Sequence, residues 1–286
     1  MNNQPQAQEG KLVGKTIGII GAGNMGEVMM RGLLTADTVD RPHLLASEIQ
    51  DDRRTFIQET YGIEMAENNA ELSRRSDIVV LAIKPQNIDK VLLEICEALE
   101  ERTLLISIVA GITTDYIASF FPDREMHIIR VMPNAPSLVL AGASALCPGR
   151  HATEEDLDLA QKIFNTTGKS VIVQPEELMD VVTGLSGSGP AFVFMMIEAL
   201  SDAGVQLGLS RKISNLLAAQ TVYGAGKMFL ETGRHAGYLR DLVATPGGTT
   251  FAGLKVLERG IFRSTVMDAV EEAAKKSAEL GRKKLT

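Results

Sequence analysis

The chain has 286 residues, a formal net charge of −7, 45% hydrophobic residues and 23% charged residues. This composition is typical of a globular protein and excludes a disordered, collagen-like or coiled-coil chain as the main architecture. The acidic balance argues against a surface that binds nucleic acid. The length predicts roughly two domains, each large enough to bury its own core.

The two cysteines, Cys96 and Cys147, have no spacing typical of a disulfide framework or a metal site. We therefore expect a cytoplasmic protein without a metal. The longest uncharged stretch, 131–149, is interrupted by prolines, so no membrane-spanning helix and no membrane partner is expected. Residues 1–14 lack the basic and apolar parts of a signal peptide and are predicted to be a disordered lead-in.

Apolar strand-like runs alternate with helical segments from residue 15 to about residue 174. This alternation predicts an α/β domain with a mostly parallel, doubly wound sheet and helices on both faces. The predicted strands are 16–20, 43–47, 78–83, 104–109, 127–131, 141–147 and 170–173. The predicted helices among them are 24–34, 52–60, 86–99 and 153–164.

Residues 175–286 show no good strand pattern and are predicted to form a separate helical domain. Its expected helices are 191–203, 211–232, 249–258 and 264–284. The segment 211–230 is apolar on nearly all sides, so it must be buried on nearly all sides. It is either a central core helix or a contact with a second subunit. A domain of about 110 residues has little interior, which favours the subunit contact.

A glycine-rich turn joins the first predicted strand to the first predicted helix. It follows Ile20 and consists of Gly21, Ala22, Gly23, Asn24, Met25 and Gly26, a G-x-G-x-x-G pattern. In this pattern the first glycine makes a tight turn, the second lets the backbone approach a pyrophosphate, and the third packs helix on strand. A ligand-free turn is the alternative, but the strand, spacing and helix together favour a dinucleotide site.

The second predicted strand ends at Ser47 and Glu48. An acidic residue at this position accepts a hydrogen bond from the ribose 2′-OH of NAD, and its charge repels the 2′-phosphate of NADP. Ser47 can instead donate to that phosphate, with Arg53 or Arg54 neutralising it. A solvated helix face is the plainer role for the two arginines. The sequence therefore leaves open whether the cofactor is NAD or NADP.

Two later strands also end in residues that suit a ligand site. Because ligands bind at the carboxyl ends of parallel strands, we expect both tips to line the cofactor. For Lys84 the alternative is a plain surface charge, and the backbone of its tip is expected to matter more than the amine. The two tips consist of Ala82, Ile83, Lys84 and Pro85, and of Ile108, Val109 and Ala110.

Two glycine-rich segments precede predicted helices, at 186–190 and 247–250. Consecutive backbone N–H groups and hydroxyls at a helix start form an anion site that suits a carboxylate or a phosphate. Capping by Ser186 or Thr249 is the alternative. Capping does not require the adjacent glycines Gly247 and Gly248, so the anion site is favoured.

With these segments the chain resembles the pyrroline-5-carboxylate reductase family. The resemblance covers about residues 15–281 and is most specific in SGSGPA at 186–191 and DLVATPGGTT at 241–250. It implies reduction of the cyclic imine 1-pyrroline-5-carboxylate to L-proline with NADH or NADPH, the last step of proline biosynthesis. It also implies a Rossmann domain followed by an all-helical C-terminal domain that binds substrate and forms a homodimer, often within a larger ring.

The resemblance also implies individual roles. The segments 20–25, 82–85 and 108–110 would hold the cofactor, with Asn68 near its adenosine half. Leu242 and Glu48 depart from residues found in other members, which bears on cofactor preference. The implied substrate-binding residues are Glu176, Ser186, Gly247, Gly248, Thr249 and Thr250, with Thr250 as the catalytic residue.

No strong catalytic acid is expected, because the imine can bind already protonated and none of the four histidines lies in a catalytic motif. The amides of 247–250 are expected to hold the substrate carboxylate while the Thr250 hydroxyl reaches the ring nitrogen. Two alternatives stay open. One is another imine or 3-hydroxyacid dehydrogenase of the same plan, although segment 190–203 lacks the acid lysine common there. The other is a non-catalytic protein that senses NAD(P).

Overall fold

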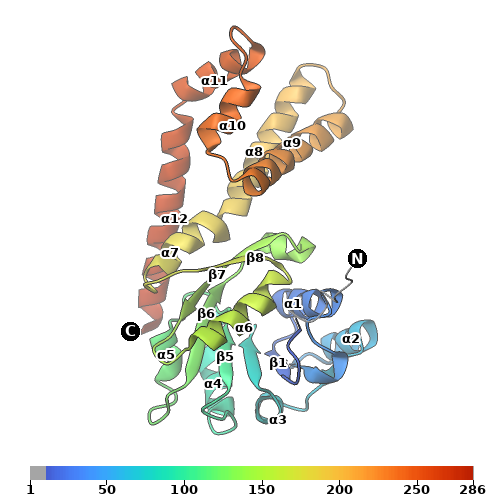
Figure 1. Cartoon of the computed structure of the whole chain (residues 1–286), viewed down its shortest axis with the longest axis vertical. Helices are drawn as coiled ribbons and strands as arrows, with labels where there is room; N and C mark the ends of the chain where they lie inside the picture. The colour runs from blue at the N-terminus through green and yellow to red at the C-terminus, as the bar shows by residue number, and fades with distance from the viewer. Residues whose placement is uncertain (1–10, 286) are drawn as a thin grey trace, which may run out of the picture. The chain divides into compact units, whose positions relative to one another are not determined.

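The computed structural model describes residues 11–285, and Figure 1 shows its helices and strands. The chain divides into two compact units. The first contains the chain up to Gly187 together with the segment from Ala274 onward, and the second runs from Ser188 to Ala273. The first unit carries the sheet, and every element described within the second is a helix.

The first unit is built on one eight-stranded sheet with the order β3-β2-β1-β4-β5-β6-β7-β8. Neighbouring strands are parallel except β6 and β7, which pair antiparallel. The predicted mostly parallel, doubly wound sheet is confirmed. The strands are β1 (Ile17–Ile20), β2 (Leu44–Ser47), β3 (Glu64–Met65), β4 (Ile78–Leu81), β5 (Leu104–Ser107), β6 (His127–Met132), β7 (Gly142–Pro148) and β8 (Gly168–Ile172).

Helices cover both faces of this sheet. One face packs against α1 (Asn24–Thr35), α2 (Asp51–Tyr61) and α6 (Glu154–Asn165). The other face packs against α3 (Asn69–Arg74), α4 (Ile88–Ile95) and α5 (Thr114–Ala118). Three short 3-10 turns complete the connections, η1 (Arg41–His43), η2 (Pro85–Asn87) and η3 (Ala135–Val139).

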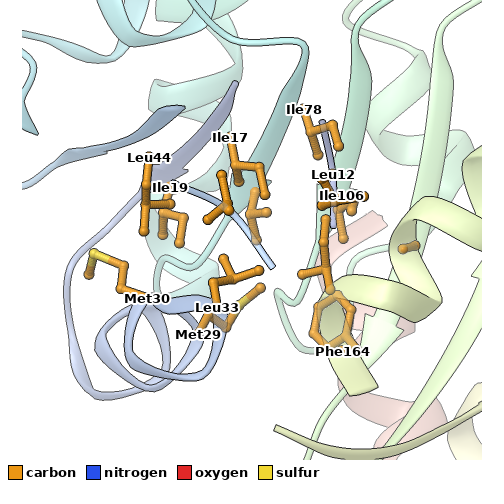
Figure 2. Close-up of a cluster of buried hydrophobic side chains, with 14 of the residues drawn as sticks. Leu12, Ile17, Ile19, Met29, Met30, Leu33, Leu44, Ile78, Ile106 and Phe164 are labelled. Carbon is orange, nitrogen blue, oxygen red and sulfur yellow. The ribbon is translucent and has the colours of Figure 1, made fainter. Parts of the chain in front are cut away.

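Side chains of the central strands alternate between two cores. Ile17 and Ile19 of β1 point toward α1 and α6, and part of this core is drawn in Figure 2. Ile20 points to the opposite face, where it joins the side chains of α3, α4 and α5. A strand covered on both faces must be apolar at successive positions, which explains the uninterrupted apolar runs in the sequence.

The lead-in predicted for residues 1–14 is ordered over the part that the structure describes. Residues 1–10 lie outside the described residues, but Leu12 is buried in the first core. Its N–H donates to the carbonyl of Thr38 at 2.8 Å, and Lys11 forms an ion pair with Asp40 at 2.8 Å. The prediction of disorder is therefore wrong for 11–14, because a single buried leucine leaves no periodic pattern to read.

Elements of a few residues escaped the sequence analysis for the same reason. β3, α3 and α5 have two, six and five residues. None of them is long enough to show a hydrophobic period. β3 nevertheless extends the sheet beyond β2, and α3 supplies part of the cavity described below.

The second unit is formed by α8 (Gly189–Gln206), α9 (Arg211–Thr232), α10 (Ala236–Val243), α11 (Thr249–Arg259) and the first half of α12 (Phe262–Leu285). α8 and α9 pack together as a hairpin. The Ser214 hydroxyl donates to the Ser201 carbonyl at 2.7 Å, and Arg211 pairs with Asp202 at 2.5 Å. Gly204 permits this approach, because a Cβ there would lie 2.0 Å from the Ser214 Oγ.

The glycine-rich run at 186–190, expected to precede a helix, is itself helical. α7 (Leu178–Val182) continues through the π-helical turn Thr183–Gly187 into α8. The small residues serve close packing here, since a Cβ at Gly187 would lie 2.8 Å from the Met132 Cε. α8 nevertheless starts within this run, at Gly189 after the N-cap residue Ser188 and with Pro190 in its first turn, as the sequence predicts.

The division between the units also differs from the predicted boundary near residue 174. α7 stays with the first unit because Met179 is buried against β7. The end of α12 returns to the first unit, where the Ser277 hydroxyl donates to Asp180 at 2.6 Å. Both contacts join segments far apart in the sequence, so local composition does not show them.

The stretch Leu178–Gln206 is long and apolar enough to cross a membrane, judged by length and composition alone. Its uncharged part is shorter than 131–149, because Asp180, Glu198 and Asp202 interrupt it. Only 6% of its most apolar window is buried within the chain. An exposed apolar helix of this kind marks a contact with lipid or with another protein. Length and composition do not separate the two.

The two cysteines are expected to differ in reactivity. Cys147 is 1% exposed, and burial, with a smaller contribution from the Glu176 charge, raises the pKa of its thiol to about 11. Cys96 is partly exposed. In the native protein at pH 8, a chromogenic disulfide reagent should titrate Cys96 at least about 100-fold faster than Cys147, because the thiolate is the reacting form. Equal rates would contradict this description, and denaturant should equalise them.

Candidate cofactor and substrate sites

The carboxyl ends of β1 and β4 border a cavity of about 990 Å³ in the first unit. The strand order reverses between these two strands, which is where doubly wound sheets bind ligands. Most of the predicted cofactor residues come together around this cavity. They are Ile20, Gly21, Gly23, Asn24, Met25, Ser47, Glu48, Asn68, Ala82, Ile83, Lys84, Pro85, Ile108 and Ala110.

The three glycines of the turn have the geometry that a dinucleotide needs. Gly21 has φ +96°, and a Cβ there would lie 2.6 Å from the Ala82 carbonyl oxygen. A Cβ at Gly26 would lie 2.1 Å from the Gly21 carbonyl oxygen, so α1 packs directly on the turn. Gly23 has open space where a side chain would project, and it lines the cavity. The residues present therefore fit a pyrophosphate at the start of α1.

Three predicted cofactor residues do not line the cavity. Ala22 is fully buried beneath the turn, Gly26 is covered by Gly21, and the Val109 side chain lies in the second core. In this structure they support the turn and the strand tips, and their contact with the cofactor stays a prediction. The Val109 side chain points to the opposite side from its neighbours Ile108 and Ala110, which line the cavity.

The Glu48 carboxylate is held by backbone N–H groups. One oxygen accepts from the N–H of Ala22 at 3.1 Å. The other accepts from the N–H groups of Ile49 and Gln50, at 2.8 and 3.1 Å. The end of β2 therefore presents a fixed negative charge beside the turn.

Arg53 and Arg54 do not form the solvated helix face expected for them. The Nε of Arg53 donates to the Ala22 carbonyl at 2.6 Å. The guanidinium of Arg54 donates to the carbonyls of Glu48 and Ala66, each at 3.0 Å. Both arginines line the cavity, because the first turn of α2 lies beside the glycine-rich turn.

Glu27, in the first turn of α1, holds Arg53 in this position. It forms an ion pair with Arg53 and accepts the Tyr61 hydroxyl at 2.7 Å. Burial by itself raises the pKa of Glu27, but the Tyr61 and Arg53 donors outweigh burial and keep it below its usual value. Burial and the adjacent carboxylate raise the pKa of Tyr61. Glu27 is therefore ionised at neutral pH and keeps its partner.

A polar network borders the cavity between β2 and α4. The Ser47 hydroxyl donates to the Asn69 Oδ1 at 2.6 Å, and the Asn69 amide donates to Glu94 at 2.8 Å. Asn68 caps α3 by accepting the N–H of Glu71 at 2.8 Å. The sequence analysis missed Asn69 and Glu94, because both become part of this wall only through the packing of α3 on α4.

Glu176 lies away from this cavity and has partners of its own. It accepts the N–H of Thr114 at 3.0 Å, the hydroxyl of Thr114 at 2.6 Å and the guanidinium of Arg130 at 3.0 Å. The Arg130 side chain is only 8% exposed. Glu176 borders a second cavity of about 640 Å³ beside Cys147. The structure thus gives Glu176 a role in joining α5 to β6, and its contact with a substrate stays a prediction.

Ser186 does not cap a helix. Its hydroxyl donates to the Val182 carbonyl at 3.1 Å, within the π-helical turn. Its carbonyl accepts the Asn134 side-chain amide at 3.0 Å. These contacts orient the backbone of the turn, and the predicted substrate contact of Ser186 is not tested by them.

The segment 247–250 forms the start of α11. Gly247 has φ +69°, and a Cβ at the N-cap residue Gly248 would lie 2.4 Å from the Thr245 Oγ. The cap has no side-chain hydrogen bond, so the alternative of capping by Thr249 is wrong. The N–H groups of the first turn thus lack a side-chain cap, which suits an anion. The Thr250 hydroxyl donates to the Val243 carbonyl at 3.1 Å.

Together the fold and the cavity define the class of Rossmann-type nicotinamide oxidoreductases with a separate helical domain. Residues 16–111 match the family model NADP oxidoreductase coenzyme F420-dependent, and 176–280 match Pyrroline-5-carboxylate reductase dimerisation. The chain is 44% identical to pyrroline-5-carboxylate reductase of Methanosarcina acetivorans, over 93% of this chain and 98% of the relative. The chain therefore belongs to the pyrroline-5-carboxylate reductase family.

Solved structures agree with this assignment. A pyrroline-5-carboxylate reductase from Coxiella burnetii has a TM-score of 0.90 and 36% identity, covering 93% of this chain and 98% of that one. The pyrroline carboxylate reductase of Plasmodium falciparum, solved with NADP bound, has a TM-score of 0.81 and 34% identity, covering 94% and 98%.

Proposed function

We propose that this chain is a cytoplasmic enzyme that reduces 1-pyrroline-5-carboxylate to L-proline with NADH or NADPH. The observation that carries the proposal is its similarity to pyrroline-5-carboxylate reductases over 93% of the chain. The open backbone at Gly23 and the start of α11 without a side-chain cap support the same reaction. Both cysteines are free, which suits a reducing compartment.

The reaction needs a bound cofactor and a positioned imine. When bound, the reduced nicotinamide supplies the hydride that the imine carbon accepts. The start of α1 would hold the pyrophosphate, and the Lys84 and Ile108 tips would border the rest of the cofactor. The chain contributes position and electrostatics, which are the protein's usual share in cofactor chemistry.

The first turn of α11 would hold the substrate. Its first backbone N–H groups, which have no side-chain cap, would bind the carboxylate. The Thr250 hydroxyl already donates its one proton to the Val243 carbonyl, so its oxygen is left as an acceptor. An acceptor at the ring nitrogen favours the protonated imine, whose N–H donates. Such an arrangement would let the reaction proceed without a strong acid from the protein.

The decisive experiment is a spectrophotometric assay of NADH and NADPH oxidation, each with purified enzyme and 1-pyrroline-5-carboxylate. Enzyme-dependent oxidation and formation of proline are expected. Oxidation that does not require the imine would contradict the proposed function, and so would the absence of oxidation with both cofactors. The reverse assay with 3-hydroxy acids and NAD or NADP tests the alternative dehydrogenase, which the absence of lysine from α8 disfavours.

We further propose that the second unit forms a homodimer, or a larger ring of dimers. Apolar side chains of α8 and α9 are exposed in the single chain, among them Phe194, Met195, Leu216 and Leu230. Such a surface exceeds what a monomer usually leaves uncovered. The match of 176–280 to a dimerisation model favours a second subunit, rather than lipid, as its cover.

The purified chain is expected to sediment at micromolar concentration as a dimer or larger, without detergent. Leu216→Glu, at a leucine that is 69% exposed on α9, should shift it toward monomer, because a charge in a buried interface is costly. Leu93→Glu is the matched control, since Leu93 is 66% exposed on α4 of the first unit. A monomer for the parent chain, or equal effects of both variants, would refute the proposed interface.

A further inference from the structure

The ribose end of the cofactor cavity holds a carboxylate that is fixed in place. Three backbone N–H groups, those of Ala22, Ile49 and Gln50, donate to Glu48 at 2.8–3.1 Å. Glu48 follows β2 and lines the cavity. In doubly wound sheets this is the position beside the adenosine ribose. A carboxylate without hydrogen bonds could rotate away from a 2′-phosphate. Glu48 would first have to break its three hydrogen bonds.

The two arginines that line the cavity, Arg53 and Arg54, donate their hydrogen bonds to protein groups. Arg53 donates to the Ala22 carbonyl at 2.6 Å and pairs with Glu27. Arg54 donates to the carbonyls of Glu48 and Ala66, each at 3.0 Å. Either arginine would have to break these bonds to turn toward a 2′-phosphate.

Glu48 and Arg53 hold the two sides of one residue of the turn. Glu48 accepts the N–H of Ala22, and Arg53 donates to its carbonyl. We call this arrangement the Ala22 clasp. Because Ala22 belongs to the glycine-rich turn, the clasp couples the placement of the carboxylate to the placement of the pyrophosphate site. Moving Glu48 away to admit a phosphate would therefore disturb the turn that binds the rest of the cofactor.

We propose that Glu48 makes this enzyme select NADH over NADPH. The carboxylate accepts from the ribose 2′-OH of NADH, and it repels the 2′-phosphate of NADPH at close range. Lys84 and Lys90 also line the cavity, so the selection is local to the ribose and not a property of the whole cavity. This inference rests on the proposed use of a nicotinamide cofactor, but it does not depend on the imine substrate.

The test compares two ligands that differ only in the phosphate, ADP-ribose and 2′-phospho-ADP-ribose, by isothermal titration calorimetry. Neither is turned over, so the readout is binding alone. The parent chain should bind ADP-ribose at least about tenfold more tightly, because the Glu48 carboxylate repels the 2′-phosphate at close range. The chain has no tryptophan, so NADH and NADPH can be compared as well by their own fluorescence.

Two variants separate the charge from the clasp. Glu48→Gln keeps the volume and an acceptor oxygen and removes the charge, and Glu48→Ser removes the whole carboxylate. Both should bring the ratio of the two affinities toward one, even if loss of the clasp weakens both ligands equally. Glu59→Gln, an exposed carboxylate of α2 that does not line the cavity, should leave the ratio unchanged.

The inference is overturned if the parent chain binds both ligands equally or prefers the phosphorylated one. It is also overturned if Glu48→Gln and Glu48→Ser keep the parent ratio. Failure of the proposed function is distinguishable. If the ratio shifts as expected but no cofactor is oxidised with the imine, the selection by Glu48 stands and the proposed reaction fails. If the imine is reduced but the two ligands bind with equal affinity, the proposed reaction stands and the selection by Glu48 fails.

Discussion

Gly23→Val is expected to weaken NADH and NADPH binding by more than about 100-fold, a loss of about 2.7 kcal/mol, while the protein stays folded. Gly23 lines the cavity and has open space where a Cβ would project. Its φ of −66° is allowed for any residue, so valine adds no backbone strain. The new side chain would fill the space that the pyrophosphate needs. Calorimetric titration of the folded variant measures the loss.

The third glycine of the same turn provides the contrast. A Cβ at Gly26 would lie 2.1 Å from the Gly21 carbonyl oxygen, so Gly26→Val should be strongly destabilised. Thermal unfolding followed by circular dichroism should therefore separate the two variants. Parent-like cofactor affinity in folded Gly23→Val would show that the pyrophosphate does not approach this backbone.

Thr250→Ala is expected to lower kcat by about 10- to 150-fold, because the variant loses the one hydrogen bond that favours the protonated, reactive form of the bound imine. The variant keeps the backbone amides at the start of α11 and removes the hydroxyl whose oxygen is available as an acceptor. Binding of proline should weaken much less, because the carboxylate contacts survive. Steady-state kinetics and a proline titration give the two quantities.

The hydroxyl of Thr250 also has a structural contact, which the controls must address. Its bond to the Val243 carbonyl joins α11 to the end of α10. Thr250→Ser retains the hydroxyl and should recover much of the rate and all of that bond. If Thr250→Ala is destabilised but turns over at the parent rate, the threonine only supports the helix start, and the substrate relies on the amides alone.

Long elements with a regular pattern were predictable from the sequence. The strands of the central sheet alternate between two cores, and this double burial is what makes them apolar throughout. The glycine pattern between β1 and α1 was also predictable, because Gly21 and Gly26 meet requirements of the local backbone and Gly23 leaves open space beside the turn. The roles of such residues follow from their immediate neighbours in the chain.

Contacts between distant segments were not predictable. Arg53 reads as a solvated residue of an exposed helix, yet it donates to Ala22, because α2 packs beside the turn. Glu94 has no motif of its own and joins the cavity wall only through α3. The same holds for Met179 and Ser277, which keep α7 and the end of α12 with the first unit.

The sequence by itself therefore determined the order of the long strands and helices, the dinucleotide turn and the glycine-rich start of α11. Each follows from hydrophobic period or from backbone sterics within a few residues. The tertiary structure decided which atoms meet: the carboxylate of Glu48 on the Ala22 N–H, and Glu176 on Arg130. Such pairings depend on how separate elements pack, and packing is a property of the whole fold and not of any one segment.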